Sequence, residues 1–130
     1  MIKVTDDTYE NFVKTGNKTK ILKLGATWCN PCQMAIPPCN ELAEELKNDV
    51  EIGELDIEES ANTPVMLSCK GVPLFVKFKE GKEVSRKVGW PGKQELKSTV
   101  ADLKTQGPLN AGWSLTLALP DFKMVKDIMV

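Results

Sequence analysis

The sequence predicts an α/β fold, in which a central mixed β-sheet is flanked by helices in the order βαβαβαββα and followed by a C-terminal extension. Three observations lead to this prediction. Short apolar runs alternate with longer stretches of helical periodicity, as expected when helices cover both faces of a sheet. A turn at Lys79–Lys82 joins the last two expected strands as a hairpin. The 130 residues suit one domain, and 42% are hydrophobic, enough for a core without structural disulfides or zinc.

Each element follows from its hydrophobic periodicity and from the residues that start or stop helices. Pro37 and Pro38 fall inside the longest helix and should kink it, because proline removes a backbone donor and clashes with the preceding turn. We expect strands separated by helices to be parallel and the final hairpin to add an antiparallel edge. The order begins with a strand for which no range is predicted. The other expected elements are a helix from Thr5 to near Gly16, a strand over 20–26, a helix over 31–48, a strand over 50–57, a helix over 60–68, strands over 74–78 and 83–88, and a helix over 92–106.

Residues 1–106 are expected to form one domain and residues 107–130 an extension that begins at Gly107-Pro108. The extension starts with strand-like alternation and ends with apolar residues at helical spacing. This composition is too apolar for an inert tail. The extension therefore packs on its own domain or binds a partner or a second copy, with a fusion remnant as the third alternative.

Charge and histidine content exclude several classes of function. The 17 Lys and Arg residues balance 18 Asp and Glu residues, so nothing favours binding to nucleic acid. The chain has no histidine, which excludes Ser-His and Cys-His nucleophile pairs and His-ligated metal centres. No apolar run is long enough to span a membrane, and the first residues lack the apolar core of a secretory signal. We therefore expect a cytoplasmic, thiol-reducing setting.

The chemistry of the chain is expected at Trp28-Cys29-Asn30-Pro31-Cys32. The two cysteines stand where a buried strand ends and a helix begins, and the amides and dipole of a helix start lower the pKa of a thiol there. Their spacing lets the second sulfur reach the first, so the pair can close a disulfide or resolve a mixed one. Pro31 suits a helix start. We expect Cys29 to be the exposed attacking thiol and Cys32 the buried resolving thiol.

Zinc binding is the alternative for any Cys-x-x-Cys pair. It requires two further ligands, but histidine is absent, and Cys39 and Cys69 do not form a second such pair. We therefore expect no metal. Cys39 and Cys69 are expected to be small buried hydrophobic residues, with redox regulation as the alternative.

These features together resemble the thioredoxin family over about residues 1–106. The resemblance includes the element order, the cysteine motif, the helix proline Pro37, Val72-Pro73 before a strand and Gly89 after the last strand. It implies the thioredoxin fold. In that family the residue matching Pro73 follows a cis peptide bond and faces the cysteines, and the substrate backbone docks beside it.

The resemblance also implies an activity and its partners. Cys29 would attack a substrate disulfide, and Cys32 would resolve the mixed disulfide and release reduced substrate. The chain would be a monomeric protein-disulfide reductase that acts on disulfide-containing proteins and is regenerated by an NADPH-linked thioredoxin reductase. It carries no nucleotide-binding signature, so we expect no cofactor. The residues expected to contact the substrate are Trp28, Asn30, Pro31, Val72, Pro73, Gly89 and Trp90.

Two other functions stay open from the sequence. A disulfide oxidase or isomerase belongs to the same chemical class. A redox-capable scaffold subunit would instead act through residues 107–130.

The chain departs from the family pattern beneath the cysteine motif. Family members usually carry a buried Asp six residues before the first cysteine and a Lys 31 residues later, where this chain has Lys23 and Glu54. One alternative is that Lys23 and Glu54 each extend their charged ends to solvent. However, Lys23 lies in the apolar run 21–25, where a charged amine needs a partner. We expect Lys23 and Glu54 to tune the thiols, either by favouring their thiolates or by accepting the Cys32 proton.

Three smaller departures surround this pair. Asn30 stands where the family motif has Gly, and Gln33 stands where Lys or Arg is usual. Gly25 stands where an aromatic residue is common, which leaves the floor of the site less filled.

Overall fold

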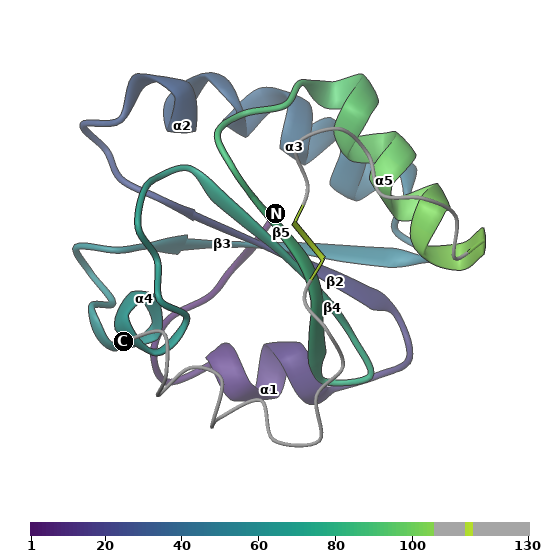
Figure 1. Cartoon of the computed structure of the whole chain (residues 1–130), viewed down its shortest axis with the longest axis horizontal. Helices are drawn as coiled ribbons and strands as arrows, with labels where there is room; N and C mark the ends of the chain where they lie inside the picture. The colour runs from purple at the N-terminus through teal and green to yellow at the C-terminus, as the bar shows by residue number, and fades with distance from the viewer. Residues whose placement is uncertain (106–113, 116–130) are drawn as a thin grey trace.

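The structure, a computed structural model, describes residues 1–105 and 114–115. Within these residues, six strands form one mixed sheet, whose central strands are labelled in Figure 1. The strand order is β1-β3-β2-β4-β5-β6. The central strand β2 pairs in parallel with β3 and antiparallel with β4. The strands are β1 (Ile2–Lys3), β2 (Thr19–Gly25), β3 (Val50–Asp56), β4 (Leu74–Lys79), β5 (Lys82–Val88) and β6 (Ser114–Leu115).

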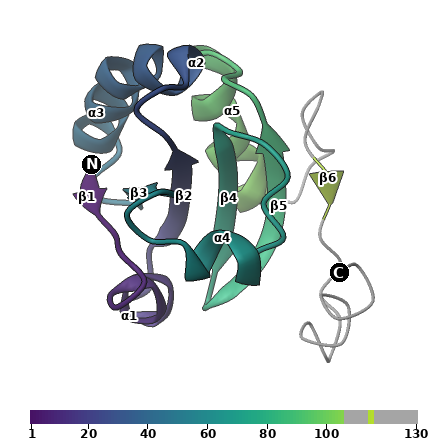
Figure 2. The same ribbon diagram turned by 90° about the vertical axis from the view of Figure 1, so that its left-hand side faces the viewer.

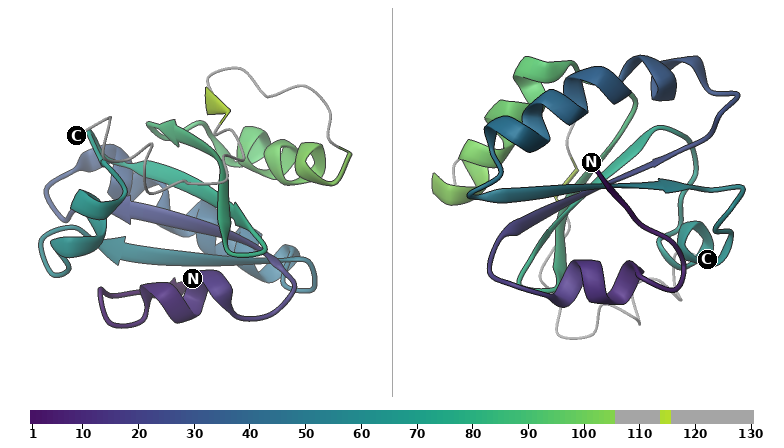
Figure 3. Two further views of the ribbon diagram at one scale, coloured as in Figure 1. Left: turned by 60° about the horizontal axis from the view of Figure 1, so that its bottom comes forward. Right: turned by 180° about the vertical axis from the view of Figure 1, so that it is seen from behind.

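Helices cover both faces of the sheet, as Figures 2 and 3 show. α1 (Tyr9–Lys14) and α4 (Asn62–Met66) lie on one face, and α2 (Asn30–Met34), α3 (Ile36–Glu45) and α5 (Lys93–Thr105) lie on the other. The core is divided in the same way, because successive strand residues point to opposite faces. Leu22 and Leu24 of β2 pack with the α1 side, whereas Ile21 packs with α3.

The expected kink after the cysteine motif is confirmed as a break between two helices. α2 ends at Met34, and α3 begins at Ile36, so that Pro37 occupies the first turn of α3. A proline is tolerated there because the amides of a first turn have no partner within the helix. α3 ends at Glu45, short of the expected residue 48.

The expectation that all strands separated by helices are parallel is wrong for β3 and β4. β2 and β3 are parallel, but β4 is antiparallel to β2 although α4 precedes it. A parallel β4 would require the connecting helix to carry the chain back along the whole of the seven-residue β3, a distance of about 23 Å. α4 has only five residues and spans about 7.5 Å. β4 therefore starts at the edge where β3 ends, and this brings Val72 and Pro73 to the start of α2.

The first helix also begins later than expected, at Tyr9 rather than Thr5. Asp6 does not belong to its first turn. Its carboxylate accepts hydrogen bonds from the amide of Thr63 (2.8 Å), the hydroxyl of Thr63 (2.7 Å) and the amide of Asn62 (3.1 Å). These bonds, the one from the Thr63 hydroxyl above all, hold the pKa of Asp6 below its usual value. Asp6 thus satisfies amides at the start of α4, a contact that depends on the tertiary fold.

Two residues of the C-terminal extension belong to the described part of the chain. Ser114 and Leu115 form β6, which pairs antiparallel with Ser85 and Arg86 of β5. The rest of the extension, including its expected helix and its expected packing or partner, lies outside the described residues.

None of the helices in the described part of the chain is both long and apolar enough to cross a bilayer.

Candidate redox site

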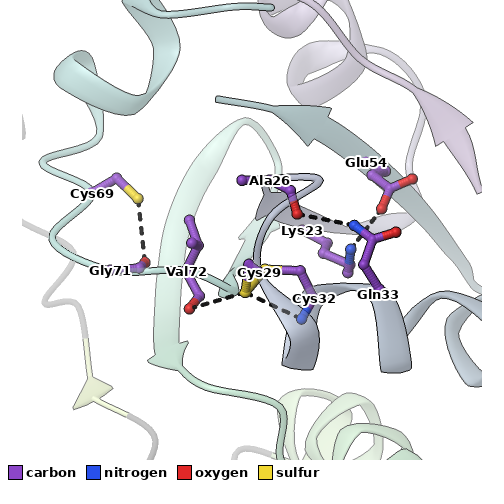
Figure 4. Close-up of a disulfide and its surroundings, with 9 residues drawn as sticks. All are labelled: Lys23, Ala26, Cys29, Cys32, Gln33, Glu54, Cys69, Gly71 and Val72. Atoms are coloured by element: carbon purple, nitrogen blue, oxygen red, sulfur yellow. Dashed lines mark hydrogen bonds and ion pairs between the residues drawn. A yellow bond between two sulfur atoms is a disulfide. The ribbon is translucent and has the colours of Figure 1, made fainter. Parts of the chain in front are cut away.

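The two motif cysteines form a disulfide at the start of α2, with their Cα atoms 5.2 Å apart (Figure 4). Cys29 is the N-cap residue, and its Sγ accepts a hydrogen bond of 3.3 Å from the amide of Cys32. Pro31 lies in the first turn, where its missing N–H removes no helical bond. An amide directed at the Cys29 sulfur stabilises negative charge on it once the disulfide is reduced.

The two sulfur-bearing residues differ in accessibility, but less than expected. Cys29 is 6% exposed and Cys32 is completely buried. Cys29 packs with Ala26 and is covered further by Ile57 and Val72. The expectation of an exposed Cys29 is therefore right only relative to Cys32.

Three segments that are far apart in the sequence meet beside Cys29. Its Sγ lies 3.6 Å from the carbonyl oxygen of Val72, to which a reduced thiol at this place can donate. The Val72–Pro73 peptide bond is cis. The amide of Gly89 donates a 2.7 Å hydrogen bond to the carbonyl of Pro73. The loops before β4 and after β5 are thereby fixed to each other next to the disulfide.

The two tryptophans named in the sequence analysis lie in different surroundings. Trp28 is 66% exposed, and Asn30 and Pro31 beside it are exposed as well. Trp90 is half-buried, and its ring packs on Phe75 with the ring centroids 5.8 Å apart. Trp90 is thus held by the core, whereas Trp28 presents its ring to solvent.

Lys23 and Glu54 form an ion pair behind the disulfide. They are direct neighbours on the parallel strands β2 and β3, and the Lys23 Nζ lies 2.6 Å from the Glu54 Oε2. Lys23 is completely buried, so its charged end does not reach solvent. The Glu54 side chain is 35% exposed and connects the pair to the surface.

Sequence reasoning missed the cavity next to this ion pair. It has a volume of about 330 Å³ and is lined in part by Gly25, Gln33, Glu54 and Asp56. The side-chain amide of Gln33 donates a 2.9 Å hydrogen bond to the carbonyl of Ala26, which fixes α2 to the end of β2 (Figure 4). Nothing in the sequence signals this contact, because it depends on how α2 leaves the sheet.

Comparison with known proteins leads to the same family as the motif and its geometry. The family model described as Thioredoxin matches residues 1–102 of this chain. The chain belongs to the thioredoxin family. The thioredoxin of Mycobacterium bovis is 34% identical over 102 residues, which are 78% of this chain and 88% of that protein. The thioredoxin of Acidithiobacillus ferridurans is 34% identical over 93 residues (72% and 86%), and that of Staphylococcus haemolyticus is 32% identical over 96 residues (74% and 90%).

Thioredoxins are protein-disulfide oxidoreductases that act on disulfide substrates. The match over most of the chain and the close Cys29–Cys32 pair make this protein a thiol–disulfide oxidoreductase with the thioredoxin fold. Within the described residues, no group of three or more His, Cys, Asp or Glu side chains is arranged to hold a metal ion.

The other two cysteines differ from the thioredoxin pair in their surroundings. Cys39 is completely buried on α3, and this burial raises the pKa of its thiol to about 11. Cys69 is half-buried, and burial raises the pKa of its thiol as well. Its Sγ lies 3.4 Å from the carbonyl of Gly71. Cys39 therefore fits the expected buried hydrophobic residue, and Cys69 fits it only in part.

In the fully reduced protein near pH 8, we expect iodoacetamide to modify Cys29 first, Cys69 more slowly and Cys39 last. A thiol with a pKa of about 11 is only about one-thousandth ionised at that pH, and the thiolate is the reactive form. Mass spectrometry of peptides sampled over time measures the order. Denatured protein is the control, in which Cys39 and Cys69 should react alike. Alkylation of native Cys39 as fast as Cys29 would contradict the assignment.

Proposed function

We propose that this protein is a protein-disulfide reductase in which Cys29 attacks the substrate and Cys32 resolves the mixed disulfide. The observation that carries the proposal is the arrangement around Cys29. It is the more accessible of the two cysteines, its sulfur receives the Cys32 amide, and the Val72 carbonyl lies beside it.

The reaction proceeds in two exchanges that conserve electrons. The Cys29 thiolate attacks one sulfur of the substrate disulfide, so that a mixed disulfide forms and the first substrate thiolate leaves and takes up a proton. The Cys32 thiolate then attacks the Cys29 Sγ, and the bond between Cys29 and the substrate breaks. The second substrate thiolate leaves and is protonated. Two electrons have passed to the substrate, and Cys29 and Cys32 end as the disulfide of the structure.

The substrate is proposed to dock as an extended segment along the surface on the Val72 side of the disulfide. The exposed Trp28 ring offers apolar contact, and the joined loops at Pro73 and Gly89 offer a fixed backbone edge. The residues proposed to contact the substrate are Trp28, Asn30, Pro31, Val72, Pro73, Gly89 and Trp90.

Lys23 is proposed to stabilise the Cys32 thiolate, with Glu54 holding the amine in place. The Lys23 Nζ lies 3.3 Å and the Cys32 Sγ lies 3.4 Å from the point where a Cβ on Gly25 would stand, so both atoms border the same small space. An ammonium at such a place attracts a thiolate strongly because the site is buried, whereas the Asp usual in the family would repel it. Lys23 and Glu54 therefore act as positioning and electrostatic groups for the resolving step.

The partners and setting are proposed from the family. An NADPH-linked thioredoxin reductase would return the disulfide to the dithiol, and the protein would act as a cytoplasmic monomer. Residues 107–130 are proposed to be an extension of the 1–106 domain, which the pairing of β6 with β5 supports.

A disulfide oxidase or isomerase is the second candidate, because a cation beside Cys32 stabilises the reduced thiolate state and so favours electron uptake. Equilibration with reduced and oxidised glutathione separates the two functions. A reductase stays oxidised in mixtures that fully reduce an oxidase.

In an insulin reduction assay, we expect Cys29→Ser to abolish turnover and Cys32→Ser to stall after the first exchange. Without Cys32 nothing displaces the substrate, so Cys32→Ser should accumulate a mixed disulfide that is visible on a non-reducing gel. Cys69→Ser is the control and should keep its activity. A mixed disulfide that accumulates in Cys29→Ser instead would reverse the proposed roles.

Lys23→Met should slow the resolving step about tenfold at neutral pH and move its pH dependence upward by roughly one unit, because the Cys32 thiolate loses its neighbouring cation. Stopped-flow reduction of Ellman's reagent in a Cys69→Ser background measures the step as the second release of thionitrobenzoate.

Lys20→Met provides a matched control for this experiment. Lys20 is also buried and is paired with Glu51 on the same two strands, but it points to the opposite face, where its Nζ lies 5.4 Å from the centre of the Phe12 ring. This variant should leave the second release unchanged. Equal slowing by both substitutions would show that lost stability, and not the charge beside Cys32, causes the effect.

A further inference from the structure

Gly25 occupies the meeting point of the ion pair and the resolving cysteine. A Cβ added to Gly25 would lie 3.3 Å from the Lys23 Nζ, 3.3 Å from the Cys32 Cβ and 3.4 Å from the Cys32 Sγ. Contacts of this length are tighter than the ordinary packing of a methyl group. The amine of Lys23 and the sulfur of Cys32 therefore both border the space that a side chain at position 25 would fill.

The backbone does not require a glycine at this position. Gly16, Gly81, Gly89 and Gly92 adopt positive φ angles, but Gly25 is a buried strand residue outside that region. Glycine weakens a strand because it costs more backbone entropy and offers no side chain to pack. The reason for Gly25 is thus the close approach of its neighbours.

Strand geometry explains why the two positions act together. Lys23 and Gly25 are two residues apart on β2, so they point to the same face, which is the face covered by α2 and α3. Gly25 also lines the cavity of about 330 Å³ that Glu54 lines from β3. The missing side chain leaves the Lys23 amine room on the side of Cys32 while the amine stays bonded to the Glu54 carboxylate.

Other charged and titratable groups lie near the Lys23 amine on this face of the sheet. Cys39 senses both Lys23 and Glu54, but burial keeps its thiol protonated. Lys77 directs its amine to the carbonyl of Thr99 at 3.3 Å. The charged and titratable groups near Lys23 on this face are Lys3 of β1, Glu54 and Asp56 of β3, Cys32 of α2, Cys39 of α3 and Lys77 of β4, and Glu59 lines the same cavity.

We infer that Gly25 is a positioning residue for the resolving step: its lack of a side chain leaves open the space through which the Lys23 amine approaches the Cys32 sulfur. The inference rests on the proposed role of Lys23. It links two departures from the family pattern, the lysine at position 23 and the glycine at position 25, as one device. A side chain at position 25 pushes the flexible lysine end away from the sulfur, because the backbone of α2 gives way less readily.

The test is a double-mutant cycle with Gly25→Ala and Lys23→Met in a Cys69→Ser background. Gly25→Ala alone should slow the second release of thionitrobenzoate several-fold and move its pH dependence in the same direction as Lys23→Met. In the Lys23→Met protein, adding Gly25→Ala should change neither the rate nor the pH profile, since the amine is already gone.

The outcomes separate this inference from the proposed function. If Lys23→Met alone leaves the second release unchanged, the role proposed for Lys23 fails, and the inference fails with it. If Lys23→Met slows the release but Gly25→Ala has no effect, or the same effect in both backgrounds, only the inference on Gly25 is overturned.

Circular dichroism of the same proteins covers the case in which Gly25→Ala does not fold. If Gly25→Ala alone is unfolded but the double variant with Lys23→Met is folded, the added methyl group collides with the lysine, which supports the inference. If Gly25→Ala and the double variant are both unfolded, the added methyl group collides with Cys32, and the inference is wrong.

Discussion

The site depends on one interaction, the ion pair between Lys23 and Glu54 across the two parallel strands at the centre of the sheet. An ammonium that is completely buried is tolerated only with a partner. The register of β2 and β3 supplies that partner by setting Glu54 directly beside Lys23, 2.6 Å from its amine. Glu54 also lines the surface cavity, so one end of the pair stays in contact with solvent.

The disulfide lies between two parts of the molecule for which we propose different roles, substrate contact and tuning of the thiols. On one side, the antiparallel direction of β4 places Val72 and Pro73 next to the disulfide, and the hydrogen bond from the Gly89 amide to the Pro73 carbonyl joins them to the end of β5. On the other side, β2 and β3 deliver the ion pair. The residues proposed to contact the substrate therefore lie on one side of the cysteines, and the residues proposed to tune the thiols lie on the other.

Local features of the sequence predicted much of this arrangement. The element order and the helix break at Pro37 follow from periodicity and proline chemistry. The cost of a buried charge indicated that Lys23 needs a partner, and the resemblance to the thioredoxin family indicated that the partner is Glu54. The direction of β4 did not follow, because it depends on how little distance α4 covers. The contact of Asp6 with α4 and the cavity beside Gly25 were also missed, since each joins segments that only the tertiary fold brings together.

The central claim is that the Lys23 amine senses the charge on Cys32, and side-chain NMR tests it most directly. Lysine labelled with ¹³C at Cε gives a Lys23 signal that Lys23→Met identifies by its loss. In the reduced protein this signal should shift with pH together with the titration of the cysteine pair, and in the oxidised protein that transition should be absent. A Lys23 signal that follows the same pH curve in both redox states would contradict the account.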